Sequence, residues 1–119
     1  MKRSEKNSVL ILKLVLSAEA RRDIKNIQDY IAEEQERPQT ALQVIEKILN
    51  RIENLLRFPD TGTLLSPKVN FPANYRYARA AGYYIFYRHE HNQIFVDRII
   101  HGKRDYITIL FPEPEGEGN

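Results

Sequence analysis

The stretch that decides the fold is residues 75–101, which read YRYARAAGYYIFYRHEHNQIFVDRIIH. Aromatic and β-branched residues, which favour β-strands, fill three short runs in it. The runs are Tyr75–Ala80, Tyr83–His89 and Ile94–Ile100. Two residues separate the first pair of runs and four separate the second pair. Connections this short predict an antiparallel three-stranded meander.

Two helices are predicted before the meander. In the first, apolar residues recur at spacings of four, three and four, at Ala20, Ile24, Ile27 and Ile31. Ser17 is a good N-cap for this helix, and Pro38 ends it near residues 36–37. The second helix is expected from about Gln39 to Arg57. Its apolar residues are Ala41, Val44, Ile45, Ile48, Leu49, Ile52, Leu55 and Leu56. The short connection predicts an antiparallel helical hairpin, and the wide apolar stripe predicts that the second helix contacts two surfaces.

The remaining segments complete the order of elements. Val9–Leu16 is apolar and β-rich, which predicts a buried strand, whereas residues 63–74 lack periodicity and predict a loop. Ile107–Phe111 is expected as a short strand or a docked terminal segment, and Pro112–Asn119 as a disordered acidic tail. The prediction is therefore an α+β fold of order β-α-α-β-β-β. A helical hairpin packs on a small, mainly antiparallel sheet, and residues 1–111 form one domain.

Composition narrows the class of protein. The chain has 119 residues, 42% of them apolar and 29% charged, which is typical of one globular domain and excludes fibrous or wholly disordered classes. There is no cysteine, so disulfides and thiol chemistry are excluded. The Val9–Leu16 stretch is too short to span a membrane, and no cleavable signal follows the charged N-terminus. We expect a cytoplasmic protein with no membrane partner.

Charge and aromatic residues are concentrated in the second half. Residues 75–106 contain six basic and three acidic residues, with tyrosines between the arginines. This pattern suits RNA or an acidic protein surface, although a solvated strand face with ordinary strand tyrosines explains it equally well. Glycine-rich phosphate loops and zinc-protease motifs are absent. His89, His91 and His101 fall at strand ends and turns, so we expect no metal and no cofactor.

Several motifs, taken in order, resemble those of the RelE/ParE superfamily of toxins from bacterial type II toxin–antitoxin (plasmid stabilisation) modules. The resemblance runs from Leu16 to Asp105. It comprises the Ser17 helix start, Phe58-Pro59-x-x-Gly62, Tyr75-Arg76, Gly82-x-Tyr84-x-x-Tyr87 and Ile99-Ile100-His101-Gly-Lys-Arg104-Asp105. It implies a small cytoplasmic toxin that forms a hetero-oligomer with an antitoxin encoded beside it. The antitoxin-binding residues that we expect are Ala41, Val44, Ile45, Ile48, Leu49, Ile52 and Leu56.

The superfamily has two branches, and this sequence resembles them to different degrees. The RelE-like branch, which cleaves mRNA on the ribosome, is similar in its cation at Arg104. That branch has basic residues opposite Tyr75, Tyr77 and Tyr84 and a tyrosine opposite Leu110, so most of its charge stabilisation is missing here. The His101-x-x-Arg104-Asp105 ending instead resembles the ParE-like branch, which inhibits DNA gyrase without being a hydrolase.

The resemblance favours gyrase inhibition and leaves two alternatives open. They are ribosome-dependent mRNA cleavage and an inactive binding domain of the same fold. The expected target-binding residues are Tyr75, Arg76, Tyr77, Tyr84 and Arg104. If the chain is an endoribonuclease, the catalytic candidates are Arg79, Arg88, Arg98, His101 and Arg104. A structural explanation also exists for the last motif, since Asp105 can pair with Arg104 or Arg98 and His101 can end a strand.

Overall fold

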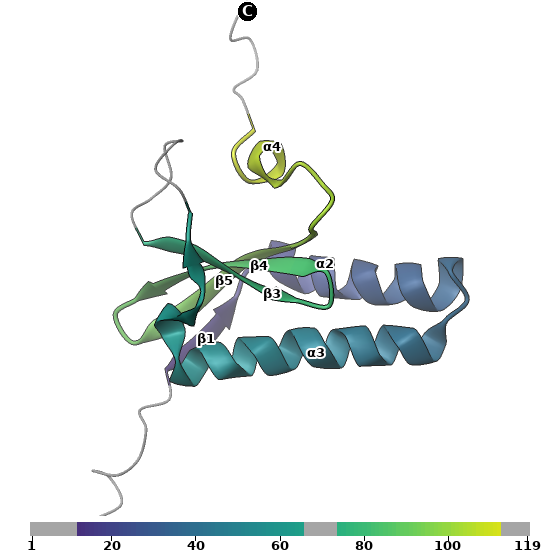
Figure 1. Ribbon diagram of the computed structural model, residues 1–119, viewed down its shortest axis with the longest axis horizontal. Coiled ribbons are helices and arrows are strands. Elements are labelled where there is room, and N and C mark those ends of the chain that lie inside the picture. Colours follow the sequence, from purple (N-terminus) through teal and green to yellow (C-terminus); the bar gives the residue numbers. More distant parts are fainter. Residues whose placement is uncertain (1–11, 66–73, 113–119) are drawn as a thin grey trace, which may run out of the picture.

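The computed structural model describes residues 12–65 and 74–112. These residues form one sheet with helices on both of its faces (Figure 1). Within these ranges five strands lie in the order β1-β5-β4-β3-β2. The strands are β1 (Lys13–Leu16), β2 (Thr63–Leu64), β3 (Tyr75–Ala80), β4 (Tyr83–Glu90) and β5 (Gln93–His101). Helices α2 (Ala18–Asp29) and α3 (Pro38–Arg57) cover one face, and α4 (Tyr106–Leu110) lies over the other. The predicted α+β fold, a helical hairpin on a mainly antiparallel sheet, is confirmed.

The meander has the predicted strands and tight turns. Strands β3 and β4 pair antiparallel from Ala80↔Tyr83 outward, and β4 pairs antiparallel with β5. The two-residue turn between β3 and β4 places Ala81 at φ 53° and Gly82 at φ 86°. Positive φ at both positions matches the right-handed twist of the flanking strands.

Strand β1 pairs parallel with β5, but only along residues 93–96. Beyond that point, polar groups at the start of α2 satisfy the exposed edge of β5. The Ser17 backbone N–H donates to the Val96 carbonyl at 3.0 Å, and its hydroxyl donates to the Asp97 carbonyl at 2.7 Å. The Asp23 carboxylate accepts from the Ile99 N–H at 2.8 Å. The first helix therefore completes hydrogen bonding that the short strand leaves open.

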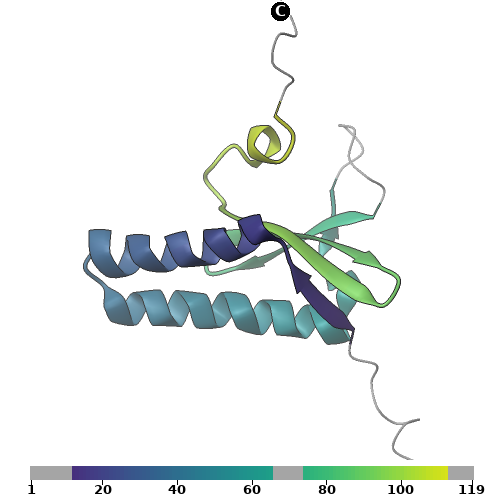
Figure 2. The same ribbon diagram turned by 180° about the vertical axis from the view of Figure 1, so that it is seen from behind.

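The helical hairpin begins and ends as the sequence predicts. Ser17 caps α2 by accepting a hydrogen bond from the Ala20 N–H. A π-helical turn, η1 (Tyr30–Glu34), extends the first helix, Glu36 adopts φ 54°, and Pro38 opens α3. Both helices run past the β3–β4 turn, so the tip of the hairpin extends beyond the sheet (Figures 1 and 2).

The main core lies between the hairpin and the sheet. Helix α3 buries Ala41, Ile48, Ile52 and Leu55. These side chains pack with Ala20, Ile27 and Ile31 of the first helix and with Ile85, Tyr87, Ile94, Val96 and Ile99 of the sheet. Most of these residues are at most 3% exposed, so this cluster provides most of the hydrophobic stabilisation.

One expectation about the connecting segments was wrong, and the structure decides between the two alternatives of another. Thr63–Leu64, expected in a loop, pairs with β3 as the short edge strand β2. Ile107–Phe111, expected as a short strand or a docked terminal segment, does not form a strand. Residues 106–110 form α4 instead, because Asp105 accepts hydrogen bonds from the N–H and hydroxyl of Thr108 and so caps a helix. The alternative expectation of a docked terminal segment is confirmed, since α4 packs on the sheet.

Some predictions fall outside the described residues. They concern residues 9–11 of the first predicted strand, most of the loop before β3, and nearly all of the acidic tail. Among the helices that the structure does describe, none is long and apolar enough to cross a membrane.

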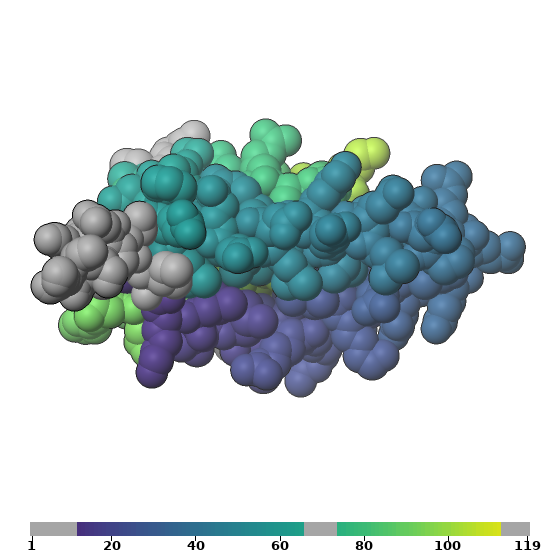
Figure 3. Space-filling view, turned by 90° about the horizontal axis from the view of Figure 1, so that it is seen from below, coloured from purple at the N-terminus to yellow at the C-terminus, as the bar shows by residue number. Residues whose placement is uncertain are grey.

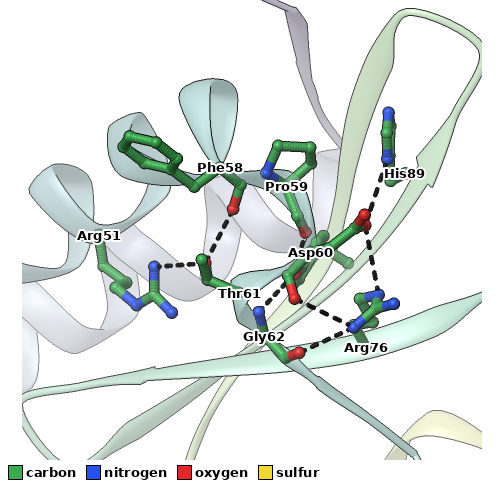
Figure 4. Close-up of polar contacts among 9 residues, drawn as sticks. Arg51, Phe58, Pro59, Asp60, Thr61, Gly62, Arg76 and His89 are labelled. Carbon is green, nitrogen blue, oxygen red and sulfur yellow. Dashed lines mark hydrogen bonds and ion pairs between the residues drawn. The ribbon is translucent and has the colours of Figure 1, made fainter.

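The Phe58–Gly62 segment at the end of α3 is held by side chains from the sheet (Figure 4). The Tyr87 hydroxyl donates to the Pro59 carbonyl at 2.6 Å and accepts from the Gly62 N–H at 3.1 Å. The Arg76 guanidinium donates to the Gly62 carbonyl at 2.9 Å and lies 3.8 Å from the Asp60 carboxylate. This set of contacts fixes the chain where it turns from α3 into the sheet.

Candidate functional site

The sheet face opposite the hairpin is lined by Tyr75, Tyr77, Tyr84 and Phe86, which we call the aromatic face. Tyr77 and Tyr84 stack with ring centroids 5.0 Å apart and planes 5° apart. Phe86 lies 5.9 Å from Tyr84 and 6.3 Å from Tyr75. The face thus presents a continuous row of rings across β3 and β4.

Helix α4 covers part of this row. The Tyr106 ring lies 5.3 Å from Tyr84 and 5.1 Å from Phe86, and Ile109 and Leu110 pack against the same cluster. Burial raises the pKa of Tyr106, as does the neighbouring Tyr84 hydroxyl. The aromatic face is therefore partly occupied by the chain itself.

Tyr75, an expected target-binding residue, is only 4% exposed. Phe111 packs edge-on against its ring at 6.0 Å. Burial raises the pKa of Tyr75 well above its ordinary value, and the Asp97 charge raises it further. Tyr77 and Tyr84 are more exposed than Tyr75, so they are the tyrosines of β3 and β4 on this face that solvent reaches.

Arg98 and Arg88 are held by carboxylates. Arg98 donates through Nε and Nη2 to the two oxygens of Asp23, at 2.8 and 3.0 Å. This bidentate pair raises the pKa of Arg98. Arg88 donates to Glu90 at 3.0 Å and lies 3.5 Å from Asp97. Both guanidinium groups are therefore neutralised within the protein.

Arg79 and Arg76 lie on opposite faces of β3. The exposed Arg79 places its guanidinium 5.3 Å from the centre of the Tyr84 ring, on the aromatic face. Arg76 alternates with Tyr75 and Tyr77 along the strand and bonds to carbonyls of the Phe58–Gly62 segment instead. Arg76 thus does not share a surface with the tyrosines grouped with it in the sequence analysis.

His101 and Arg104 line a pocket of about 660 Å³ between the hairpin tip, the start of β4 and the end of β5. His101 is the last residue of β5, and its ring packs edge-on against Tyr83 at 5.1 Å. Its Nδ1 accepts a hydrogen bond from the Lys103 N–H, so the neutral ring carries its proton on Nε2. The Arg104 guanidinium forms no ion pair with any residue that the structure describes.

The five catalytic candidates are therefore distributed over three places. His101 and Arg104 share the pocket beside the hairpin tip, whereas Arg88 and Arg98 border a smaller one beside α4. Arg79 lies apart from both, on β3, where it lines a third pocket together with Arg51. Among the described residues, no group of three histidine or acidic side chains could hold a metal ion.

The expected antitoxin-binding residues divide into two groups. Ala41, Ile48 and Ile52 are at most 2% exposed and belong to the core under the sheet. Val44, Ile45, Leu49 and Leu56 are partly or well exposed. Leu42 was not predicted, although it is 63% exposed and lies one heptad before Leu49, which is 45% exposed. The unburied residues are thus Leu42, Val44, Ile45, Leu49 and Leu56.

Sequence reasoning missed the role of Asp23. The helical pattern gives no role to Asp23, whereas in the structure it binds Arg98 and the Ile99 N–H. A signal was present, since Asp23 falls three residues after Ala20 and four before Ile27, on the buried stripe. A carboxylate on such a stripe needs a buried partner. The alternative pairing of Asp105 with Arg98 or Arg104 is not observed, because Asp105 caps α4.

Comparisons with known proteins place these features in a family. Residues 14–106 match the model of the ParE toxin of the parDE type II toxin–antitoxin system. This match spans most of the chain, and the protein belongs to the ParE toxin family, within the RelE/ParE superfamily of type II toxins. Searching curated protein sequences gives no match.

Three solved structures share the fold. The chromosomal ParDE system of P. aeruginosa gives a TM-score of 0.60 at 19% identity, covering 76% of this chain and 96% of that one. The RelBE2 toxin–antitoxin complex of Mycobacterium tuberculosis gives 0.53 at 22% identity, and a YoeB/ParE toxin of Agrobacterium tumefaciens gives 0.53 at 23%. Each of these two covers 76% of this chain and 98% of its own. At these identities the likeness shows the fold, which both branches of the superfamily share.

Proposed function

We propose that this chain is a cytoplasmic toxin, neutralised by an antitoxin, that acts on DNA gyrase and does not cut mRNA. We choose gyrase as the target because of the composition of the aromatic face. Phosphodiester cleavage needs cations free to stabilise charge in the transition state. Here rings and α4 fill that face, and Arg88 and Arg98 are bound by Glu90, Asp97 and Asp23. Such a surface favours contact with a protein over cleavage of RNA.

Family membership supports the same choice. The matched family is that of the ParE toxin, and the resemblance of the His101-x-x-Arg104-Asp105 ending is to the branch that inhibits gyrase. In this proposal Tyr77, Tyr84 and Arg79 form the part of the aromatic face that gyrase contacts.

Purified chain should therefore block the supercoiling of relaxed plasmid by purified gyrase. In a translating extract, primer extension on mRNA should show no added cuts, because Arg88 and Arg98 are bound by carboxylates and the remaining candidate cations, Arg79 and Arg104, lie in different places. Unchanged supercoiling together with cuts at fixed codon positions would contradict the proposal and favour an endoribonuclease. In that event Arg104→Ala and His101→Ala should abolish cutting. If the chain neither blocks supercoiling nor cuts mRNA, the remaining alternative is an inactive binding domain of the same fold.

The antitoxin is proposed to bind the outer side of α3. Leu42, Ile45, Leu49 and Leu56 follow helical spacing on this helix, apart from the residues that face the sheet. The space-filling view shows α2 and α3 side by side, forming one long face of the molecule (Figure 3). An exposed apolar stripe of this kind suits an amphipathic segment of a partner protein.

Replacing Leu42 and Leu49 by glutamate should weaken the complex with the product of the adjacent open reading frame. Each leucine that the partner buries contributes about 1.5–3 kcal/mol, so each change should lower affinity at least about tenfold. Titration calorimetry on the purified proteins measures this. Gln43→Glu and Asn50→Glu add the same charge to exposed positions of α3 and serve as controls. Equal affinity for all four variants would place the antitoxin elsewhere.

A further inference from the structure

The pocket between the hairpin tip and the sheet has a lining that selects its ligand. Its base is apolar, formed by Ile27, Ile31, Val44 and Ile99. The rest of the lining is mostly polar and includes Tyr30, Tyr83, His101 and Arg104, together with Asn26, Gln35 and Thr40. At about 660 Å³, the pocket is large enough for one or two side chains of a bound peptide.

Two side chains of this pocket, Arg104 and His101, favour an anionic ligand. Arg104 supplies a guanidinium without an ion-pair partner in the described ranges, and His101 presents an Nε2–H because its Nδ1 is already bonded. The one carboxylate in the lining, Asp23, already accepts bonds from Arg98 and the Ile99 N–H. The pocket therefore offers a positive charge and a neighbouring ring N–H donor, and a carboxylate is the group complementary to both.

The surroundings disfavour a nucleic acid. Gln35 lines the pocket, and its chain neighbours at the hairpin tip, Glu34 and Glu36, are exposed acids. Glu33 adds a third acid one position further, against one exposed cation, Arg37. A polyphosphate backbone approaching Arg104 would be repelled by these carboxylates. A peptide with a single acid beside an apolar side chain would be repelled less, because it carries fewer charges, and a basic residue further along it would be attracted to the tip.

We propose that this pocket anchors the antitoxin by taking an apolar side chain and an adjacent Asp or Glu, whose carboxylate pairs with Arg104. This inference rests on the proposed function, since it presumes the antitoxin. It adds a second contact, at the hairpin tip, to the stripe on the outer side of α3. It also assigns Arg104 to partner recognition, whereas the sequence analysis assigned it to the target or to catalysis.

The test compares variants in binding to the product of the adjacent open reading frame, measured by titration calorimetry on full-length proteins. Arg104→Gln should lower affinity about ten- to a hundredfold, the range of a hydrogen-bonded charge pair. Lys103→Gln removes an exposed neighbouring charge outside the pocket and should stay within about twofold. Thr40→Trp should fill the pocket and weaken binding, whereas Gln43→Trp adds the same ring outside it.

A scan of acidic residues in the antitoxin completes the test. One Asp→Asn or Glu→Gln change should weaken binding to the unaltered toxin and have no further effect on Arg104→Gln. Thermal melts that match the parent chain confirm that the variants are folded. If Arg104→Gln and Thr40→Trp bind as tightly as the parent, the pocket is not the anchor, while the proposed function stands. If the parent chain forms no complex, the proposed antitoxin and this inference both fail. If Arg104→Gln instead loses only the binding of a single-stranded RNA oligonucleotide, the pocket serves nucleic acid and the inference is wrong.

Discussion

Replacing Gly62 by alanine should destabilise the protein by about 3–5 kcal/mol, a large part of the stability of a domain this size. A Cβ built at this position meets the Tyr87 hydroxyl oxygen first and then the Tyr77 carbonyl oxygen at 2.7 Å. Overpacking of this kind costs about 1–3 kcal/mol. Moving the Tyr87 hydroxyl away would also break its bonds to Pro59 and Gly62, at about 1 kcal/mol each. Urea unfolding followed by circular dichroism measures the change.

Two further variants separate the clash from a general intolerance of substitution. Gly82→Ala has open space around its Cβ but a φ of 86°, so it should cost only about 1–2 kcal/mol. Tyr87→Phe removes the hydroxyl that the new methyl group meets. The double variant Gly62→Ala/Tyr87→Phe should therefore be more stable than the sum of the single changes implies. Strict additivity, or a loss at Gly62 no greater than at Gly82, would show that the close approach is not the reason for this glycine.

The fold was predictable because its determinants are local. Strand composition, two short turns and two helical stripes are each visible within a dozen residues, and they fixed the order and type of the main elements. Helix α4 escaped prediction because Ile107-Thr108-Ile109 has strand propensity, and the Asp105 cap that overrides it is a single side chain. The edge strand β2 is two residues long and is defined only by its partner β3.

The candidate site was less predictable because burial and pairing are not local. Tyr75, Tyr77 and Tyr84 share a face, as alternation predicts, yet only the position of α4 and Phe111 decides that Tyr75 is buried. Residue type likewise does not distinguish Arg104, which has no ion-pair partner among residues 12–65 and 74–112, from Arg98, whose partner lies 75 positions earlier in the chain. The functional consequence is that most of the arginines that suggested RNA chemistry are structural.

The Asp23–Arg98 pair is the clearest case of a charged contact on which the site depends. Asp23 fixes α2 against β5 through three hydrogen bonds, two from Arg98 and one from the Ile99 N–H. The carboxylate side chain is 12% exposed and the guanidinium 26%. Ile99, Ile100 and His101 follow Arg98 directly and line the same pocket as Asp23. A change at Asp23 should therefore affect both stability and the pocket that contains Arg104.

Asp23→Ala should lower the free energy of unfolding by about 2–4 kcal/mol, because it leaves a partly buried guanidinium and a backbone N–H without acceptors. Arg98→Ala should cost less, since the Asp23 carboxylate keeps its bond from Ile99. Asp29→Ala is the matched control on the same helix, because its ion pair with Lys25 is exposed and its loss should not move the unfolding midpoint measurably. Urea unfolding of the three variants and of Asp23→Ala/Arg98→Ala gives the coupling between the two side chains. If Asp23→Ala unfolds at the same urea concentration as Asp29→Ala, α2 is held by apolar packing alone, and the pocket at the hairpin tip does not depend on this pair.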